Sequence, residues 1–350
     1  MIFGGGVSAQ EILTRDEAMK LALQHNYEIQ VADKNIESAQ NNASIYNTGF
    51  LPTASVSGAG QISYNAGKNQ TIQGDQIFDA SEAYTYNASV GVNYVIFNGF
   101  GRMYNYKQLL EQHYLTKLQA KQIIENTMLQ LSSSYFEVAQ LSENIGILQN
   151  ALEISKTRLI RAQYGYEYGQ GTQLDILNAE VDVNNDSINL LNTGQQLANA
   201  KRNLNLIMGR ILDTDFMVDT NVIFHLALNT DEITAYALER NIQIEQTQSQ
   251  LRNSEFALKA GRAGWFPSLS ANADYSYSGI QNPNGAFLLG NHSYGPQVGL
   301  NLSWNIFDGG ITKTQTQSAK IALETQKIQQ EQTTYSVQML MQRMKMRSLY

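Results

Sequence analysis

The chain has 350 residues, enough for one to three ordinary domains. Charged residues make up 16 % and hydrophobic residues 43 %, with a formal net charge of −7, which excludes an intrinsically disordered chain. No apolar stretch reaches the roughly 18 residues of a transmembrane helix. An excess of acidic over basic residues argues against nucleic acid as a partner. The sequence contains no Cys, which excludes disulfides and thiolate metal sites.

Both ends of the sequence have unusual features. Residues 1–9 end in Val7-Ser8-Ala9, the small-residue pattern that precedes signal-peptidase cleavage, so they are interpreted as a signal-peptide remnant. The other end, Tyr350, lies inside a strongly helical pattern without a Gly or Pro stop signal. The sequence therefore predicts a fragment.

The chain repeats itself. With an offset of 215 positions, residues 16–55 align with 231–270 without a gap, and Pro52 meets Pro267. With an offset of 210, Tyr84 meets Tyr294, and Ile96-Phe97-Asn98-Gly99 meets Ile306-Phe307-Asp308-Gly309. These alignments predict two tandem repeats, at 10–208 and 230–350, joined by a linker at 209–229.

Each repeat begins with a helical pattern. Residues 16–48 and 231–263 contain no proline and are rich in good helix formers. Gly49 and Gly264 are placed to end the two helices as C-cap glycines, and the prolines that follow prevent their continuation.

Amphipathic strands come next in each repeat. Apolar and polar residues alternate with period two from Ala54, Ser89, Leu269 and Gly299 onward, which is typical of strands with one apolar face. The polar segments Ala66–Ala83 and Gly279–Asn291 are expected to be loops. An ordinary sheet on a soluble core is one reading. A small, uncharged polar face and aromatic residues at both strand ends favour a membrane-spanning wall.

In that reading, the strand residues divide between lipid and lumen. The expected lipid-facing residues are Val56, Val90, Val92, Tyr94, Leu269, Ala271, Leu300, Leu302 and Trp304. The expected lumen-facing residues are Ser55, Ser57, Asn93, Ser270, Asn272, Asp274, Asn301 and Ser303. Four strands cannot close alone, so two copies would give eight strands and three copies twelve.

A very long helix follows the first strand pair. It runs from Gly101 to about Tyr168, with apolar residues every seventh position, as in a coiled-coil seam. A glycine-rich turn at Gly165–Thr172 and a returning helix at Gln173–Met208 complete a helical hairpin. A second hairpin begins at Gly310 and stops at Tyr350, before its tip.

These motifs together resemble the TolC family of outer-membrane efflux proteins. The resemblance rests on Phe50-Leu-Pro-Thr-Ala-Ser, Ile96-Phe-Asn-Gly, Tyr166-Glu-Tyr-Gly-Gln-Gly-Thr172, Trp265-Phe-Pro and Ile306-Phe-Asp-Gly, in this order. It implies a mixed α and β fold of long antiparallel helical hairpins (an α-barrel segment) and four strands in a trimeric 12-stranded β-barrel. It also implies an export duct in the Gram-negative outer membrane that extends into the periplasm and serves a tripartite efflux or type I secretion system.

The resemblance implies partners and sites as well. Besides two further copies and outer-membrane lipid, the partners are a periplasmic adaptor protein and an inner-membrane pump. The tip that contacts the adaptor is Tyr168, Gly169, Gln170, Gly171 and Thr172. The junction of barrel and tube is Pro52, Gly99, Gly101, Pro267, Gly309 and Gly310. The alternative is a structural, fibre-like coiled-coil protein without a conducting lumen.

Other chemical sites find little support. His25, His113, His225 and His292 have no metal-ligand spacing, so structural roles are expected. Gly99-Phe100-Gly101 lacks the remaining residues of a phosphate loop and is interpreted as a turn. The acidic residues Asp175, Glu180, Asp182 and Asp186 are either solvated helix surface or an electronegative tube mouth. No catalytic constellation, cofactor site or metal site is predicted, and hence no enzyme.

Overall fold

The computed structural model describes residues 12–72, 74–221, 236, 240–281 and 290–347. The chain forms two compact units. Unit 1 contains Met1–Glu37, Thr116–Ile242 and Met341–Tyr350, and unit 2 contains Ser38–Leu115 and Gln243–Leu340. The signal-peptide interpretation falls on residues that lie outside the described part of the chain.

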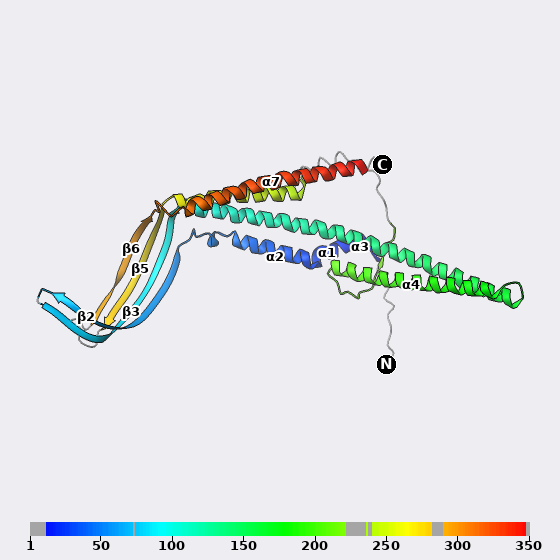
Figure 1. Ribbon diagram of the computed structural model, residues 1–350, viewed down its shortest axis with the longest axis horizontal. Helices are drawn as coiled ribbons and strands as arrows, with labels where there is room; N and C mark the ends of the chain where they lie inside the picture. The colour runs from blue at the N-terminus through cyan, green and yellow to red at the C-terminus, as the bar shows by residue number, and fades with distance from the viewer. Residues whose placement is uncertain (1–11, 73, 222–235, 237–239, 282–289, 348–350) are drawn as a thin grey trace. The chain divides into compact units, whose positions relative to one another are not determined.

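Unit 2 is built on a four-stranded antiparallel sheet in the order β2-β3-β5-β6 (Figure 1). The strands are β2 (Thr53–Thr71), β3 (Gly74–Asn98), β5 (Ser268–Gln281) and β6 (Gly290–Ser303). In Figure 1, the β2–β3 hairpin continues beyond the ends of β5 and β6.

The loop expected over 66–83 is wrong. After an irregularity between Asn65 and Gly67, β2 and β3 stay paired as far as Thr71 and Gly74. Two strands that extend past their neighbours are held by the main-chain hydrogen bonds of their own ladder, and this pairing does not require the alternation of apolar residues by which a half-buried strand is predicted. The loop expected over 279–291 is also too long, because Gly279–Gln281 pair with residues 290–292, and residues 282–289 lie outside the described chain.

The sheet register places apolar and polar residues on opposite faces. Directly paired residues of antiparallel strands point to the same side. One such row is Val56, Val90 and Tyr275, and the next apolar row along β3 and β5 includes Val92 and Ala273. The polar rows between them include Ser57, Ser89 and Ser276. One face is therefore apolar across all four strands.

Helices and 3₁₀ turns precede and follow the strand pairs in the sequence, and they join the sheet at one end. The elements are the 3₁₀ turn η1 (Ile45–Asn47), α6 (Ile242–Gly261), the 3₁₀ turn η2 (Arg262–Trp265) and α7 (Ile311–Arg347). Gly49 has the positive φ of +68° that a helix-ending glycine adopts, whereas Gly264 lies inside η2. Gly264 is required for another reason, because a Cβ there would come 2.6 Å from Thr312 Oγ1.

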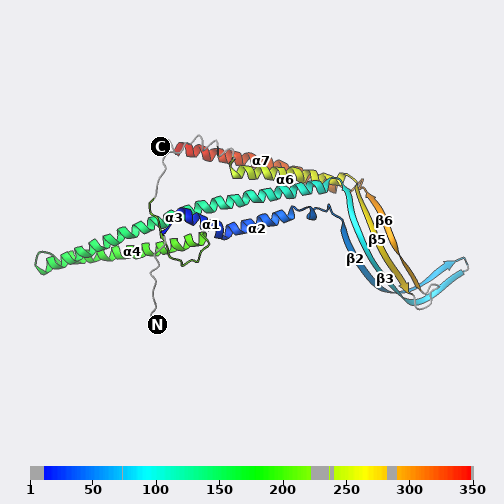
Figure 2. The same cartoon turned by 180° about the vertical axis from the view of Figure 1, so that it is seen from behind.

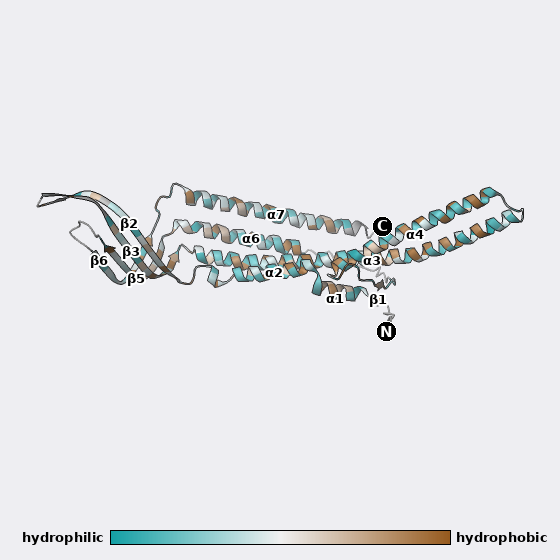
Figure 3. Ribbon diagram, turned by 90° about the horizontal axis from the view of Figure 1, so that it is seen from below, coloured by the Kyte–Doolittle hydropathy of each residue, from teal (hydrophilic) through white to brown (hydrophobic). Residues whose placement is uncertain are grey.

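Unit 1 is organised around the long helical hairpin. Its helices are α1 (Arg15–His25), α4 (Gln173–Ile207) and most of α2 (Tyr27–Asn42) and α3 (Gly101–Glu167), of which residues 38–42 and 101–115 belong to unit 2. The 67 residues of α3 correspond to about 100 Å of helix. Figure 2 shows α3 and α4 joined by a tight turn, and Figure 3 shows hydrophobic and hydrophilic residues interleaved along both helices. The predicted hairpin is confirmed.

The core of unit 1 lies where these helices meet the short strands β1 (Ile12–Leu13) and β4 (Met217–Val218), which pair in parallel. The seam residues Leu131, Val138 and Leu204 are completely buried there. The hydroxyl of Tyr135 donates to Leu13 O at 2.9 Å and accepts from Asp219 N at 3.1 Å. One side chain of α3 thus holds both short strands.

The single helix expected over 16–48 is broken at Asn26. The Asn26 Nδ2 donates to Ile207 O at 2.8 Å, and its Oδ1 accepts from Ile29 N at 3.1 Å, as an N-cap does. A Cβ at Gly209 would lie 2.1 Å from His25 O, so the end of α4 approaches the break very closely. Of the helix expected over 231–263, Tyr236 and Arg240 are helical, Asn241 is not, and α6 begins at Ile242, whereas residues 231–235 and 237–239 lie outside the described chain.

Candidate channel wall and docking tip

The residues expected to face lipid lie on the apolar face of the sheet. In the single chain, Val56 is 81 % exposed and Leu300 is 73 % exposed, although both are aliphatic. Val90, Val92, Tyr94 and Leu302 are exposed as well, whereas Leu269 and Ala271 of β5 are half-buried. The apolar face therefore has no covering protein layer within the described chain.

Trp304 was expected among these strand residues, and that expectation is corrected. The residue lies just beyond the end of β6 at Ser303, so it is not a strand residue in the single chain. Its indole Nε1 donates to Trp265 O at 3.3 Å. The alternation in the sequence continues past Ser303, but β6 has no outer neighbour that would keep the chain extended.

The residues expected to face a lumen lie on the polar face. Ser55, Ser57, Asn93, Asn301 and Ser303 are exposed, and Ser270, Asn272 and Asp274 on the inner strand β5 are half-buried. The hydroxyls of Ser57 and Ser89 are hydrogen-bonded at 2.7 Å. A Cβ at Gly299 would lie 2.9 Å from Asn272 Oδ1, and one at Gly91 would lie 3.3 Å from the Asp274 Cβ. Polar side chains therefore lie over neighbouring glycines.

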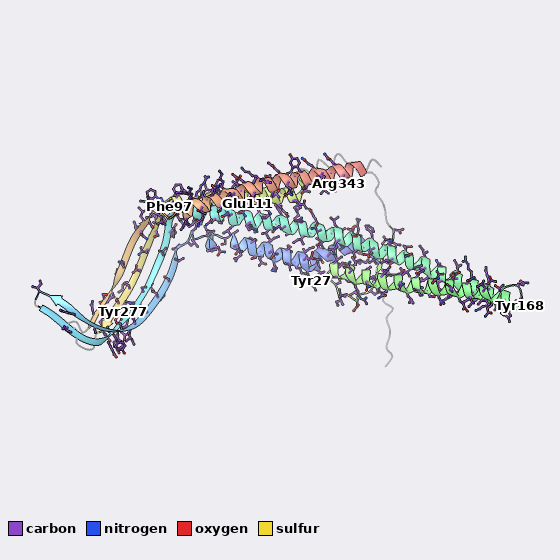
Figure 4. The ribbon with its side chains drawn as sticks, in the orientation of Figure 1. Tyr27, Phe97, Glu111, Tyr168, Tyr277 and Arg343 are labelled. Carbon is purple, nitrogen blue, oxygen red and sulfur yellow. The ribbon has the colours of Figure 1, made fainter. Side chains whose placement is uncertain are left out.

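Tyrosines gather at the end of the sheet that is remote from the helices, where Figure 4 labels Tyr277. Tyr64 and Tyr84 both donate to the Glu82 carboxylate, at 3.0 and 2.7 Å. Tyr277 stacks on His292, and the Tyr277 hydroxyl is 2.8 Å from His292 Nδ1. Sequence reasoning found the tyrosines but missed these polar partners, because cross-strand neighbours depend on the register.

Two corners join the strands to the helices. The first corner is residues 49–52 with 98–102, and the second corner is residues 264–267 with 308–312. The expected junction residues lie in these corners: Pro52, Gly99 and Gly101 in the first, and Pro267, Gly309 and Gly310 in the second. Gly99, with φ +65°, packs so closely that a Cβ would come 2.4 Å from Ala263 O. Phe97, labelled in Figure 4, marks the same region.

Arg102 closes the first corner and was missed by sequence reasoning. Its guanidinium donates to Gly49 O at 2.6 Å and to Ile96 O at 3.0 Å. It also lies 5.0 Å from the centroid of the Phe50 ring, a distance typical of a cation–π contact. Its conformation ties the entry of β2 to the end of β3 and the start of α3.

The second corner uses an acidic side chain. The Asp308 carboxylate accepts from Thr312 N at 2.8 Å and from Gly310 N at 2.9 Å. These hydrogen bonds, that of Thr312 above all, hold the pKa of Asp308 below its usual value. Asp308 thereby stabilises the start of α7 in the manner of an N-cap.

The tip between α3 and α4 brings the five expected contact residues together. Tyr168 is 76 % exposed, and Figure 4 labels it at the turn. Gly169 has φ +71°, and its N–H donates to Tyr166 O at 3.0 Å. The Gln170 N–H donates to Gly165 O at 2.7 Å. The tip is therefore a hydrogen-bonded turn that presents tyrosine rings.

The beginning of α4 is fixed by a reciprocal cap. Thr172 Oγ1 accepts from Asp175 N, and Asp175 Oδ2 accepts from Thr172 N at 2.8 Å. The hydrogen bonds from Thr172 lower the pKa of Asp175. Of the other acidic residues expected near the tip, Glu180 and Asp182 are exposed, and Asp186 accepts a hydrogen bond from Ser155.

The remaining candidate sites are not assembled into a centre. His25, His113 and His292 lie on separate elements, and His225 lies outside the described residues. Within the described residues, no group of three or more His, Cys, Asp and Glu side chains is arranged to hold a metal ion. None of the helices in the described part of the chain is both long and apolar enough to cross a bilayer.

Several known proteins with similar sequences are efflux proteins. The sequence model of the outer membrane efflux protein family matches residues 18–210 and 235–340. The chain is 22 % identical to the outer membrane efflux protein BepC of Brucella suis, over 94 % of this chain and 68 % of BepC. It is 21 % identical to the probable efflux pump outer membrane protein TtgC of Pseudomonas putida, over 91 % of this chain and 64 % of TtgC. The chain thus spans about two thirds of these relatives' length.

Solved structures confirm the fold. The Campylobacter jejuni CmeC outer membrane channel superposes with a TM-score of 0.74 at 16 % identity, covering 92 % of this chain and 68 % of CmeC. CusC superposes with a TM-score of 0.71 at 14 % identity, covering 95 % of this chain and 75 % of CusC. With the family match across both repeats and this common fold, the chain belongs to the outer membrane efflux protein family.

Proposed function

We propose that copies of this chain close into a barrel in the Gram-negative outer membrane and form the passive export duct of a tripartite efflux or type I secretion system. The single observation that carries the proposal is the sheet of unit 2. Its apolar face is exposed, and its outer strands β2 and β6 each have only one strand partner in the described chain.

An open sheet of this kind is unstable in lipid. Each unpaired N–H or C=O group in hydrocarbon costs several kcal/mol, so both edges must find partners. Further copies supply them, because β2 and β6 run antiparallel to each other when copies are placed edge to edge. Three copies give twelve strands, which leave a water-filled lumen, whereas the eight strands of two copies are filled by side chains.

The polar face suits the lumen of such a barrel. Ser57, Asn272 and Asn301 have small, uncharged side chains, and the glycines beside them add no side chain that would narrow the lumen. Water and passing solutes would meet small hydrogen-bonding groups there, which supports a duct.

The outward face fits outer-membrane lipid. Val56, Leu300 and Leu302 supply the apolar band, and Tyr64, Tyr84 and Tyr294 supply the aromatic belt that membrane barrels have at an interface. The helices following the two corners would line the periplasmic tube. The names of BepC and TtgC support a role in efflux.

Substitution of adjacent residues on β6 tests the wall. Leu302→Arg places a charge on the apolar face, which costs about 2–4 kcal/mol near the bilayer midplane. Asn301→Arg is the matched control, since it puts the same charge on the polar face one residue away. We expect Leu302→Arg to abolish assembly and conductance in planar bilayers. Asn301→Arg should conduct with altered ion selectivity. Equal behaviour of the two variants, or a wild-type protein that never conducts, contradicts the proposal.

The tip is proposed to dock the helical hairpin of a periplasmic adaptor, which in turn joins an inner-membrane pump. A Cβ at Gly171 would lie 3.3 Å from the backbone of Gly165 and Tyr166, so Gly171→Val distorts the turn. Gly194→Val is the control, because a Cβ at Gly194 has open space on α4. We expect the first variant to form intact oligomers that no longer retain the adaptor in a pull-down, and the second to retain it. Unchanged adaptor retention by Gly171→Val removes the assignment.

A further inference from the structure

The two strand pairs of the sheet have the same register. Val56 is paired with Val90 in the first pair, and Ala271 is paired with Leu300 in the second. In the internal alignment, Val56 corresponds to Ala271 and Val90 corresponds to Leu300. The sequence repeat and the strand pairing therefore coincide residue by residue, which allows one pair to serve as a template for the other.

The pairing of β3 with β5, which joins the two strand pairs inside the chain, is then a template for the strand pairing between two copies. Inside the chain, β3 of the first repeat pairs with β5 of the second, with Val90 opposite Tyr275 and Val92 opposite Ala273. The corresponding strands at the open edges are β6 and β2. Transferring the register replaces Val90 by Leu300 and Tyr275 by Gly60.

We propose that β6 of one copy pairs antiparallel with β2 of the next in a single register, with Leu300 opposite Gly60 and Ser303 opposite Ser57 of the neighbouring copy. This inference rests on the proposed barrel and specifies how its copies join. The faces agree, because Leu300 and Gly60 lie on the apolar face and the two serines on the polar face. A slip by one residue would exchange the faces along the whole seam.

Side-chain size supports the same register. The large outward residues Leu300 and Leu302 come opposite Gly60 and Gly58, so the aliphatic side chains can lie across the glycines of the neighbouring strand. The same arrangement occurs inside the chain, where Gly60 is paired with Tyr86 and a Cβ at Gly60 would lie 4.0 Å from the Tyr86 ring.

The early end of β6 indicates where a strand of a neighbouring copy would pair. In the first repeat, β3 remains a strand as far as Asn98, which pairs with Ser268. In the second repeat, β6 ends at Ser303, although Trp304–Asp308 correspond to Tyr94–Asn98. Ile306 is 87 % exposed, whereas its counterpart Ile96 is 43 % exposed. Pairing with the start of the neighbouring β2 would extend β6 through these residues.

At the second corner, the glycine that corresponds to Gly99 is not covered by other residues of the described chain. Gly99 is covered by Ala263, whereas Gly309 has a similar φ of +69° and nothing within 4 Å of an added Cβ. Ala263 corresponds to Thr48 in the alignment. The turn after η1 of the neighbouring copy, which contains Thr48, is therefore expected to pack over Gly309.

Disulfide cross-linking tests the register directly, because the chain contains no Cys. Opposite residues of antiparallel strands have Cα atoms about 4.5–5.5 Å apart, within the range of a disulfide. Ser57→Cys/Ser303→Cys is the predicted pair, and Ala59→Cys/Asn301→Cys is a second predicted pair. Ser55→Cys/Ser303→Cys is the matched control, shifted by two residues on the same face. Ser57 and Ser303 lie on opposite edge strands, about 14 Å apart across the sheet, so a disulfide must join two copies.

We expect mild oxidation of the full chain in outer membranes to give covalent oligomers on non-reducing gels for both predicted pairs. Their yield should exceed that of the control and of each single variant at least tenfold. More cross-linking in the shifted control, or none in either predicted pair although the reduced variants conduct, overturns the register and leaves the barrel standing. A wild-type chain that forms no oligomer and no conducting channel overturns the barrel itself.

Discussion

Removal of one hydroxyl from the core of unit 1 tests how its two short strands are held. Tyr135 is 2 % exposed, and its hydroxyl bonds both Leu13 O and Asp219 N. Tyr135→Phe keeps the ring and deletes the two hydrogen bonds, each worth about 1 kcal/mol net. The part-buried backbone groups left without this partner add to the loss. We expect local opening of the β1–β4 pair to become easier by about 2–3 kcal/mol.

Hydrogen exchange of the purified protein in detergent measures this change. Protection of the Val218 and Asp219 amides should fall by about 30-fold or more, since 2 kcal/mol corresponds to that factor. Tyr335→Phe is the control, because Tyr335 is 70 % exposed on α7. Protection that stays within threefold of the wild type would refute the role of the hydroxyl. Equal losses throughout unit 2 would refute its local character.

The stabilisation that the Tyr135 hydroxyl contributes should also depend on pH. Burial raises the pKa of the Tyr135 phenol above its ordinary value of 10.0. The neutral phenol therefore contributes its full stabilisation below pH 10, and the contribution is lost as the pH rises through the folded-state pKa. The difference in protection between wild type and Tyr135→Phe should shrink above pH 10 and stay constant between pH 6 and 9.

Two further substitutions test other contacts. The Glu111 carboxylate accepts from Arg252 Nη2 at 2.7 Å and from Ser249 Oγ at 2.6 Å. Arg252→Ala removes the first hydrogen bond and should destabilise the α3–α6 contact by about 1 kcal/mol. Faster hydrogen exchange in α6 checks this, and Arg252→Lys should recover part of the loss. Thr172→Ala removes the N-cap of α4 at a cost of about 1 kcal/mol, which should fray its first turn, whereas Thr172→Ser should preserve exchange protection. Protection of α4 that is insensitive to Thr172→Ala would mean that the tip is held by other contacts.

Features that depend only on residues close together in the chain could be predicted from the sequence. Alternation at Val90, Val92 and Tyr94 predicted a strand with an apolar face, because every second side chain of a strand points to the same side. The absence of proline and the heptad pattern predicted nearly the whole of α3, including its end near Tyr168. Such patterns need no knowledge of distant partners.

Features that depend on distant contacts could not be predicted. The break at Asn26 is stabilised by Ile207 O, 181 positions away. The clamp of Arg102 requires Gly49 O, 53 positions away. The extension of the β2–β3 hairpin rests on main-chain pairing, to which side-chain hydropathy contributes no signal. β6 ends at Ser303 despite the continuing alternation, and it has no outer neighbour in the described chain.

The two corners show that duplicated segments have diverged in the forces that hold them. At the first corner, the long Arg102 side chain reaches Gly49 O through a charged hydrogen bond. At the second, the corresponding Thr312 packs directly against Gly264, where even a methyl group would collide. The first corner therefore depends on a positively charged side chain, and the second depends on the absence of a side chain at Gly264. Exchanging Arg102 and Thr312 would give a chain with the same composition, and we expect it to break both joints.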